Sequence, residues 1–379
     1  MSVTADTLLS LTRMSLGKDS VDSLPNVVSI PWNEVYEQAL VQGVCALCSS
    51  VVAERGETWG LDEDLRFEWL GQTMVVERLY ARQLKSISKL AHFYAESGLS
   101  MMLLKGYGLS LNYPVSQRRP VGDIDIFLMN QSDEGRNNRF SAWQLGDRSV
   151  HERLGIDVDE GHEHHTTFVF EGHVVENHYD FINTKVSWTG RWVEAKLKEL
   201  ATSDVREVPV GVGKDGLPIR MFLPSPDFNA IFLMRHMGQH CASERILLRH
   251  LLDWALFLEH FSSQVHWNWV VPFWKQIGIL EFARCVNRIC CDSLGFDEAL
   301  FHGQLSSDEA LSARVLNDIL SPEFDEMKPQ GGLMKVVFFK TRRFFANGWK
   351  RRLVFKESLF ESFILGSIAH LQRFKTIKD

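Results

Sequence analysis

The spacing of apolar residues changes twice along this chain of 379 residues, and this change constrains the fold more than any other feature. From about residue 31 to 97, apolar side chains recur every three or four residues, which is typical of amphipathic helices. Short apolar runs broken by turns follow, and the helical pattern returns at Leu223. The sequence therefore predicts an α+β fold with an N-terminal helical region (1–98), a strand-containing core (99–222) and a C-terminal helical region (223–379).

Two strands are expected at the start of the core. The apolar run 100–104 is closed by a Lys-Gly turn and reads as a buried strand. Residues 122–128 form a second expected strand, in which Asp123 and Asp125 alternate with aliphatic residues. Because successive side chains of a strand point to opposite sides, both carboxylates are expected on one face. A polar helical stretch is expected from Ser132 to Leu154.

A hairpin is expected further along the core. Thr166–Phe170 and His173–Phe181 are strand-like and are joined by a Glu-Gly turn. In the second strand, Glu176, His178 and Asp180 are spaced by two and are expected on one face. Two strands of the core thus each present acids on a single face.

Convergent carboxylates point to phosphoryl-transfer chemistry. Carboxylates on adjacent strands are what a pair of divalent cations needs, with two acids shared between the metals and a third completing one of them. Mg²⁺ is the expected ion, in two copies, with Mn²⁺ as the alternative. The same alternation of acids and aliphatics also occurs on ordinary half-exposed strands.

Several segments together carry a family resemblance. They are residues 103–109 (LLKGYGL), 119–125 (RPVGDID), 175–178 (VENH), 223–227 (LPSPD) and 249–253 (RHLLD), with His236 and His240 between the last two. Over about residues 32–260 the chain resembles the uncharacterised nucleotidyltransferase family of the polymerase-beta-like superfamily. The resemblance implies a small mixed sheet flanked by helices. It also implies transfer of a nucleoside monophosphate from a nucleoside triphosphate. The acceptor is expected to be a hydroxyl of a molecule other than nucleic acid, such as a sugar, a metabolite or a protein.

The resemblance also implies residue roles. By position, the metal ligands are Asp123, Asp125 and Glu176, and the nucleotide-binding residues are Lys105, Gly106 and Arg119. One departure concerns the first turn, where the superfamily usually has Gly-Gly or Gly-Ser close to the two aspartates. Here Gly106 is followed by Tyr107, and sixteen residues separate Gly106 from Asp123. Ser110 and Ser116 are the candidate substitutes for the missing serine. A catalytically silent nucleotide-binding or interaction module and a metal-dependent phosphohydrolase therefore remain as alternatives.

The downstream helical motif contains further candidate substrate contacts. His236 and His240 lie four apart but lack the glutamate of a zinc-protease helix, so hydrogen-bonded structural histidines are favoured over substrate contacts. Arg249 and Asp253 are also four apart. Their simplest interpretation is an ion pair along a helix, and the alternative is that both face the cleft and orient the acceptor.

Other histidine and cysteine side chains also have structural interpretations that involve no chemistry. His162, His164 and His165 are expected to be solvated loop residues, with metal binding as the alternative. His178 shares a face with Glu176, so it is a candidate for orienting a metal ligand or carrying a proton, and Asp180 is grouped with it. Cys45 and Cys48 are expected to pack in the core.

Charge and composition limit the partners. Residues 331–379 carry eleven Lys/Arg and three Asp/Glu, a net of +8, which leaves −15 for the first 330 residues. An acidic body makes nucleic acid an unlikely partner. The segment 338–363 interleaves basic and aromatic residues. It is expected to form core-packed helices with a basic outer face, and peripheral contact with an anionic membrane is the next alternative. That contact requires Trp349, Lys350, Arg351 and Arg352 to be accessible together.

The expected location is the cytoplasm. The six cysteines are too sparse for a disulfide framework, and no uncharged apolar run reaches 18 residues. The first twenty residues lack the basic start and continuous apolar stretch of a signal peptide. The acceptor, the preferred nucleobase and the oligomeric state are not encoded in any recognisable pattern.

Overall fold

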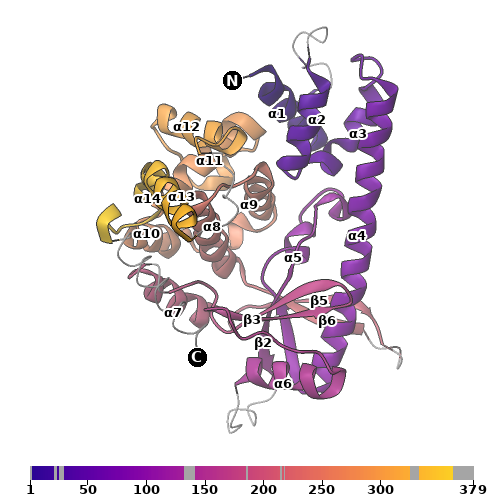
Figure 1. The fold of residues 1–379 in the computed structure, drawn as a ribbon, viewed down its shortest axis with the longest axis vertical. Coiled ribbons are helices and arrows are strands. Elements are labelled where there is room, and N and C mark those ends of the chain that lie inside the picture. Colours follow the sequence, from indigo (N-terminus) through magenta and orange to yellow (C-terminus); the bar gives the residue numbers. More distant parts are fainter. Residues whose placement is uncertain are drawn as a thin grey trace.

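The computed structural model describes residues 2–20, 24, 30–131, 141–184, 187–213, 216, 218–324 and 333–361 (Figure 1). The N-terminal helices are α1 (Val3–Ser15), α2 (Trp32–Val41), α3 (Cys45–Arg55) and α4 (Glu63–Glu96). The central elements are β1 (Leu99–Leu103), α5 (Tyr107–Ser110), β2 (Ile124–Asn130), α6 (Ala142–Leu154), β3 (His165–Phe170), β4 (His173–His178), α7 (Gly190–Leu200), β5 (Arg206–Val212) and β6 (Pro218–Leu223). The C-terminal helices are α8 (Pro226–Ser243), α9 (Leu248–Phe261), α10 (Trp267–Ile277), α11 (Leu280–Leu294), α12 (Glu309–Leu320), α13 (Leu333–Ala346) and α14 (Gly348–Val354).

The strands form one six-stranded mixed sheet in the order β3-β4-β2-β1-β6-β5. β2 runs antiparallel to β1 and parallel to β4, so it lies in the middle of the sheet. The pairing places Asp125 of β2 directly beside Glu176 of β4. The chain is therefore an α+β protein, as the sequence predicts.

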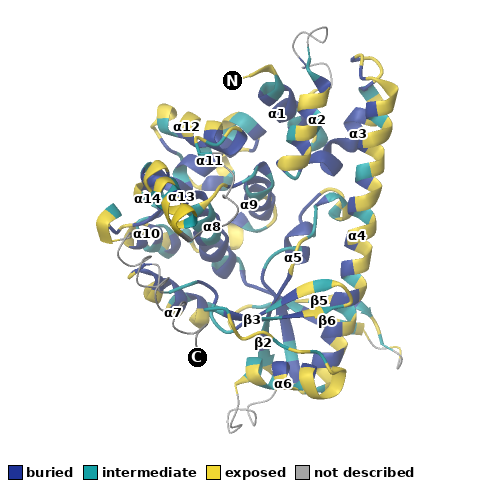
Figure 2. Ribbon diagram, viewed as in Figure 1, coloured by how far each residue is buried: buried dark blue, intermediate teal, exposed yellow. Residues whose placement is uncertain are grey.

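The two faces of the sheet are covered by different helices (Figures 1 and 2). α4 and α6 pack on one face, where Ile87 and Leu90 of α4 and Val150 of α6 join Ile124 and Ile126 of β2 in one apolar cluster. The opposite face of β2 presents Asp125 and Phe127. On that side, the C-terminal helices form a second cluster, which also takes in the N-terminal helices α1 to α3. The acids of β2 thus point toward the C-terminal helices and away from α4.

Local sequence signals account for several element boundaries. The hydroxyl of Ser225 caps α8 and Pro226 occupies its first turn. The hairpin between β3 and β4 turns at Glu171 (φ 50°) and Gly172 (φ 83°), as expected. α6 begins at Ala142, and the expected helical residues 132–140 lie outside the described residues. The short helix α5 begins directly after Gly106 and ends at Ser110.

The two cysteines of the N-terminal region pack in the core, as predicted. Cys45 and Cys48 are buried in α3, and neither is in a disulfide. Burial raises the pKa of Cys48 to about 11, and a neighbouring Thr12 hydroxyl lies 3.9 Å from its sulfur. Both thiols therefore stay protonated and unreactive at neutral pH.

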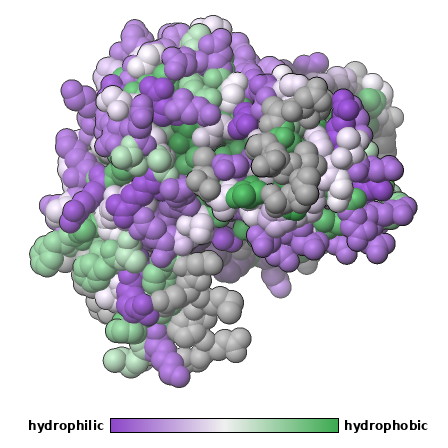
Figure 3. Space-filling view, turned by 90° about the horizontal axis from the view of Figure 1, so that it is seen from above, coloured by the Kyte–Doolittle hydropathy of each residue, from purple (hydrophilic) through white to green (hydrophobic). Residues whose placement is uncertain are grey.

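The basic tail only partly matches expectation. Lys350 was expected at the surface, but its side chain is 0% exposed and its ammonium group lies 2.5 Å from the Asp318 carboxylate of α12. Trp349 donates its indole N–H to Glu323 rather than standing free. The exposed apolar residues are instead on α13 and just beyond α14, among them Met334, Phe338, Phe345 and Phe360. Figure 3 shows apolar side chains in green along the edge of the molecule where Figure 1 places α13. None of the described helices has the length and apolar character needed to cross a bilayer.

Candidate functional site

The sheet side of the site is built where β1 ends and β2 begins. The backbone N–H of Leu104 donates to the Asp125 carbonyl, which fixes the two segments side by side. Lys105 follows immediately, and its Nζ lies 2.9 Å from Asp125 Oδ1. Gly106 then turns the chain with φ 64° and ψ −113°, a conformation that favours glycine. The Lys-Gly pair thus ends the strand and directs the lysine toward the acids.

Glu176 and His178 of β4 complete this wall. They are two residues apart and lie on the face that carries Asp125. His178 Nε2 lies 3.2 Å from Asp125 Oδ1 and 3.4 Å from Glu176 Oε2. Single ligand atoms of Asp125, Glu176 and His178 all fall within 4.8 Å of one another. The structure therefore brings together two of the three predicted carboxylates, with His178 between them.

The third carboxylate, Asp123, stands at the entrance just before β2 and is exposed. The loop that carries it is fixed from α4, where Gln83 donates a hydrogen bond of 2.6 Å to the Gly122 carbonyl. Partial burial, together with the negative charges of Glu176 and Asp125, raises the pKa of Asp123. Asp123 is therefore close enough to the other two acids for their charges to oppose its ionisation.

The charges inside this wall compensate one another. Burial alone would raise the pKa of Asp125, but the neighbouring Lys105 and His178 hold it far below its usual range. Burial alone would lower the pKa of Lys105, and the adjacent Asp125, with Glu176 and Asp123 beyond it, raises it above its usual value. The Lys105 side chain is 27% exposed, whereas that of Asp125 is 3% exposed. A buried carboxylate is thus neutralised by a partly exposed cation.

A cleft of about 240 Å³ lies in front of these acids. Its sheet side contains Lys105, Gly106, Asp123 and Asp125. Its helical side, on α8 and α9, contains His236, His240, Arg249, His250 and Asp253. All but three of the candidate site residues therefore line one cleft or its floor. Glu176 and His178 adjoin it through Asp125, and Asp180 does not reach it.

Arg119 and Asp253 form a bidentate ion pair in the cleft. Arg119 Nε and Nη2 donate to the two carboxylate oxygens of Asp253 at 2.7 and 2.8 Å, and the hydroxyl of Tyr113 adds a third bond at 2.8 Å. The ion pair expected between Arg249 and Asp253 is therefore wrong, because Asp253 forms its ion pair with Arg119 instead. The guanidinium of Arg119 is likewise directed at a carboxylate instead of at the position predicted for phosphate.

Within the described part of the chain, ring contacts and not the expected hydrogen bonds hold the side chains of His236 and His240 on the helical wall. Among the described residues, His236 lies against Phe232 and His240, with the two imidazole centroids 4.5 Å apart. His250, which sequence reasoning did not single out, accepts a hydrogen bond of 2.9 Å at Nδ1 from the Leu247 backbone. Burial, with Arg249 beside it, lowers the pKa of His250 to about 3. The wall therefore presents neutral imidazoles to the cleft.

Two candidates are not available at the site. Asp180 lies beyond the end of β4, and its carboxylate forms an ion pair with Lys198 of α7. The alternation ends because the backbone N–H groups of both Tyr179 and Asp180 donate to the carbonyl of His164. Ser110, a candidate for holding phosphate, is fully buried and donates to the Tyr107 carbonyl at 2.6 Å.

His164 and His165, expected as solvated loop residues, are instead packed beside Glu176. His165 begins β3, and its Nε2 lies 3.7 Å from Glu176 Oε1. Burial lowers the pKa of His164 to about 3 and that of His165 to about 4. His162 stacks on His165 at 4.6 Å between ring centroids. The hairpin thus places a cluster of imidazoles against the acids, which the His-rich tract indicated only as an alternative.

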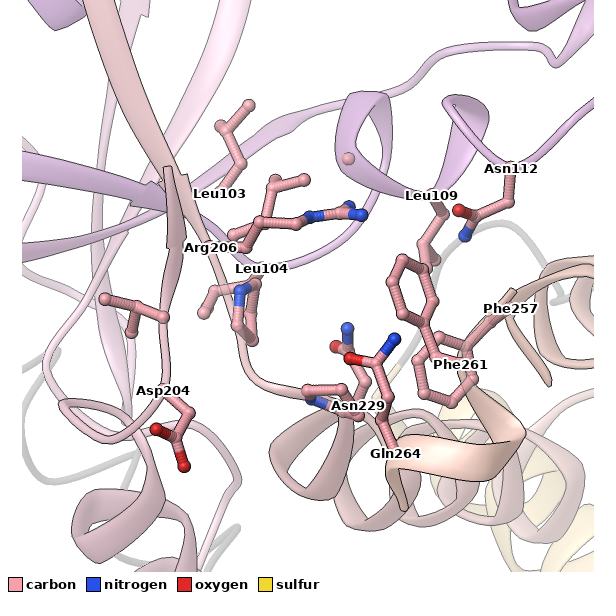
Figure 4. Close-up of a pocket in the computed structure, with 15 residues that line it drawn as sticks. Leu103, Leu104, Leu109, Asn112, Asp204, Arg206, Asn229, Phe257, Phe261 and Gln264 are labelled. Atoms are coloured by element: carbon pink, nitrogen blue, oxygen red, sulfur yellow. The ribbon is translucent and has the colours of Figure 1, made fainter. Parts of the chain in front are cut away.

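A second cavity, of about 340 Å³, adjoins the cleft, and Leu109 lines both. Figure 4 shows the amides of Asn112, Asn229 and Gln264 with Arg206 around a floor that includes Phe257 and Phe261. The Oδ1 atom of Asn229 is buried and accepts no hydrogen bond from the described residues. The cavity therefore combines an aromatic surface with amide groups that are suited to a polar organic molecule.

The donor set fits a divalent cation of the magnesium type. Asp123, Asp125 and Glu176 offer carboxylate oxygens from the start of β2 and from β4, and partial burial with the charges of Glu176 and Asp125 raises the pKa of Asp123. Oxygen ligands on two adjacent backbone segments are what Mg²⁺ and Mn²⁺ bind.

A family model described as uncharacterised nucleotidyltransferase matches residues 29–295, and this span includes every residue of the cleft. No curated protein and no solved structure shows a significant similarity to the chain. The chain belongs to the uncharacterised nucleotidyltransferase family and is a nucleotidyltransferase.

Proposed function

We propose that the enzyme transfers a nucleoside monophosphate from a nucleoside triphosphate to a hydroxyl of a small non-nucleic-acid acceptor, with divalent cations held by Asp123, Asp125 and Glu176. The observation that carries this proposal is the pairing of Asp125 beside Glu176, with ligand atoms that, together with one of His178, lie within 4.8 Å of one another. Mg²⁺ bound there supplies charge neutralisation and an activated acceptor oxygen, and Mn²⁺ is the alternative ion.

The reaction joins the acceptor oxygen to the α-phosphorus and breaks the bond from that phosphorus to the bridging oxygen, so pyrophosphate leaves. Lys105 is placed to neutralise the negative charge of the phosphate groups during this reaction. Its ammonium group lies 2.9 Å from Asp125 but is 27% exposed, so it can turn from the carboxylate to phosphate oxygens in the cleft. The hydroxyl proton of the acceptor passes to water at the mouth of the cleft, where Asp123 is exposed.

Arg119 acts as a positioning residue in this proposal. Its bidentate bond to Asp253 ties the loop before β2 to α9 and keeps the helical wall at a fixed distance from Asp123. The loop that supplies the metal ligand and the helix that closes the cleft then move as one body. The ion pair of Arg119 with Asp253 therefore shapes the mouth of the cleft, and the Arg119 guanidinium does not bind phosphate in this proposal.

The second cavity suits the acceptor. It shares Leu109 with the cleft, and Leu104, which lines it, precedes Lys105 in the chain. Amide groups of Asn112, Asn229 and Gln264 favour a sugar or a similar hydroxyl-bearing metabolite over a protein side chain. Nucleic acid is disfavoured because the first 330 residues carry a net charge of −15. In this proposal the protein works in the cytoplasm.

Incubation with each labelled nucleoside triphosphate and Mg²⁺, in the presence of pooled small metabolites, tests the proposal. Pyrophosphate release together with a labelled product is the expected result, and both should disappear in Asp123→Asn. Asp123 is the suitable variant because its exposed side chain contributes little to folding. Asp157→Asn, another exposed acid but one remote from the cleft, is the matched control.

The products separate this proposal from its two alternatives. Release of inorganic phosphate without a nucleotidylated product would indicate a phosphohydrolase. Mg²⁺-dependent nucleotide binding without any product, across all four bases and the whole pool, would indicate a silent binding module.

A further inference from the structure

We propose that His164, His165 and His178 bind a transition-metal ion, with zinc as the ion that suits them best, at a position next to the carboxylates. This site goes beyond the proposed nucleotidyl transfer and does not depend on it. It is formed by the β3–β4 hairpin alone, apart from the contact of His178 with Asp125.

The hairpin places the three imidazoles together. His165 and His178 are direct partners across the antiparallel pair, and His164 precedes β3. Their ring centroids lie 4.4 Å (His164 to His165), 5.1 Å (His165 to His178) and 5.7 Å (His164 to His178) apart. One nitrogen of each ring lies within 4.8 Å of the other two. Three potential nitrogen ligands are therefore gathered in one place.

The nitrogens of His165 have no partner that explains their burial. The residue is 6% exposed, and no described protein group makes a hydrogen bond to either ring nitrogen. Nδ1 of His164 is also buried without such a bond. A buried polar atom left without a partner is costly, so three such atoms in one cluster require an explanation. Coordination of a cation would satisfy the nitrogens that face it.

His178 is oriented as a metal ligand. Its Nδ1–H donates to the carbonyl of Asp180 at 3.2 Å, since a carbonyl oxygen can only accept. This bond fixes the ring and turns Nε2 toward the acids, which is the arrangement that histidine ligands of metals commonly show. Asp180, which does not reach the site through its carboxylate, thus contributes through its backbone.

Glu176 supplies the fourth ligand. Its Oε1 lies 3.7 Å from His165 Nε2, and its Oε2 lies 3.4 Å from His178 Nε2. Three imidazoles and one carboxylate are a set that Zn²⁺ binds in tetrahedral geometry. Tetrahedral ligands about 2.0 Å from zinc are about 3.3 Å apart, so the set closes with movements on the order of 1 Å. Mg²⁺ prefers oxygen ligands and does not compete for the imidazoles.

The nitrogen site and the oxygen site are neighbours that share Glu176 and meet where His178 contacts Asp125. His178 Nε2 cannot bind zinc and remain bonded to Asp125 Oδ1, so zinc would release that oxygen to the second cation. Glu176 has one oxygen near His165 and one near His178, and a carboxylate can bridge two metals in this way. A transition ion on the hairpin would therefore prepare the carboxylates for Mg²⁺.

Titration of the untagged, EDTA-treated full-length protein with Co²⁺ and Zn²⁺ tests the proposal. We expect visible absorption bands that saturate at one Co²⁺ per chain, are displaced by one Zn²⁺, and persist in excess Mg²⁺. His165→Ala should weaken zinc binding more than about 100-fold, because loss of an outer hydrogen-bond partner alone costs about 10–100-fold. His164→Ala, which alters a half-buried ring, is the second variant in case His165→Ala does not fold.

Two further variants separate the possible outcomes. His151→Ala removes an exposed histidine of α6 and should leave zinc binding unchanged. Asp123→Asn should abolish nucleotidyl transfer and keep the cobalt spectrum, so failure of one proposal does not imply failure of the other. The proposal is overturned if Co²⁺ produces no saturable spectrum, or if His164→Ala and His165→Ala bind zinc as tightly as the unchanged protein.

Discussion

The two walls of the cleft each hold a buried aspartate that is paired with a cation, yet the pairs are built differently. On the helical wall, both oxygens of Asp253 are held by Arg119 and one also by Tyr113. On the sheet wall, one oxygen of Asp125 accepts from Lys105 and from His178, and two further carboxylates stand nearby. The first pair is complete in itself. In the second pair, Lys105 and His178 occupy the position beside Asp125 that a metal cation could take.

This difference suggests a structural role for the pair of Arg119 with Asp253 and a chemical role for the pair of Lys105 with Asp125. A bidentate arginine pair is geometrically specific and loses little freedom when it forms, so it suits a strut between loop and helix. A lysine with a partly exposed ammonium group can leave its carboxylate at low cost. We therefore expect changes on the sheet wall to affect activity and changes on the helical wall to affect stability.

The largest expected effect comes from the sheet wall. Asp125→Asn should reduce nucleotidyl transfer roughly 1,000-fold or more, because a ligand charge needed in the transition state is lost. The protein should still fold, since water can solvate the released Lys105 ammonium group. Pyrophosphate release measures the first effect and circular dichroism the second. A folded Asp125→Asn protein with full activity would place the chemistry elsewhere.

The same substitution on the helical wall should lower stability more than activity. Asp253→Asn leaves the buried Arg119 guanidinium without its counter-charge and should lower the free energy of unfolding by about 3 kcal/mol. Urea denaturation measures this loss. The double change Arg119→Met/Asp253→Leu removes both charges and should recover most of it. If the double variant were as unstable as the single one, the pair would not be a self-contained strut.

The walls also illustrate what the sequence could predict. The acids of β2 and β4 were identifiable because strand alternation is local, and the family resemblance covers the same segments. The pairing of Asp125 with Glu176 could not be predicted, because the register of two strands depends on the whole sheet. The bond between Arg119 and Asp253 was missed for a similar reason, because it joins residues far apart in the chain, whereas a spacing of four suggested a pair within one helix.

Other errors have equally physical causes. Asp180 fits the alternation of β4, but the strand ends at His178, and no local signal marks that end. β5 and β6 were not foreseen, because Pro209 and Gly211 interrupt β5 at a register shift. Lys350 looked like a surface charge, since sequence shows a lysine but not the Asp318 carboxylate that accompanies it into the interior.

The helical wall should also respond to acid. The pKa of His250 is lowered to about 3, so the unfolded chain, with a histidine pKa of about 6.5, binds more protons between these values. Stability must then fall as pH decreases through this window, by about 2 kcal/mol between pH 7 and pH 5. Protonation at Nδ1 would also remove the acceptor for the Leu247 N–H. The groups around His250 are Arg249, Asp253, His240 and Arg119.

His250→Asn isolates this contribution, because an asparagine oxygen can still accept from the Leu247 backbone without titrating. Urea denaturation at pH 7 and pH 5 should show a smaller loss of stability in the variant than in the unchanged protein. An equal loss in both would assign the acid sensitivity to other groups, with His164 and His165 on the sheet side as the next candidates, since their pKa values are also lowered by burial.

The smallest expected effect lies outside both walls, on the face of α13 that holds the exposed apolar side chains. Phe338 and Phe345 are 65% and 60% exposed and share the helix with Lys335. We expect weak binding to acidic vesicles at low salt, since each basic residue near an anionic surface contributes about 1 kcal/mol and the aromatic rings add apolar contact. Sedimentation with vesicles should show this binding decline with rising salt and with Phe338→Ala/Phe345→Ala. Lys350→Ala is the informative comparison, because a lysine paired with Asp318 in the interior should affect stability and leave vesicle binding unchanged. If the protein ignores acidic vesicles at low salt, α13 is a structural cap with an apolar exterior.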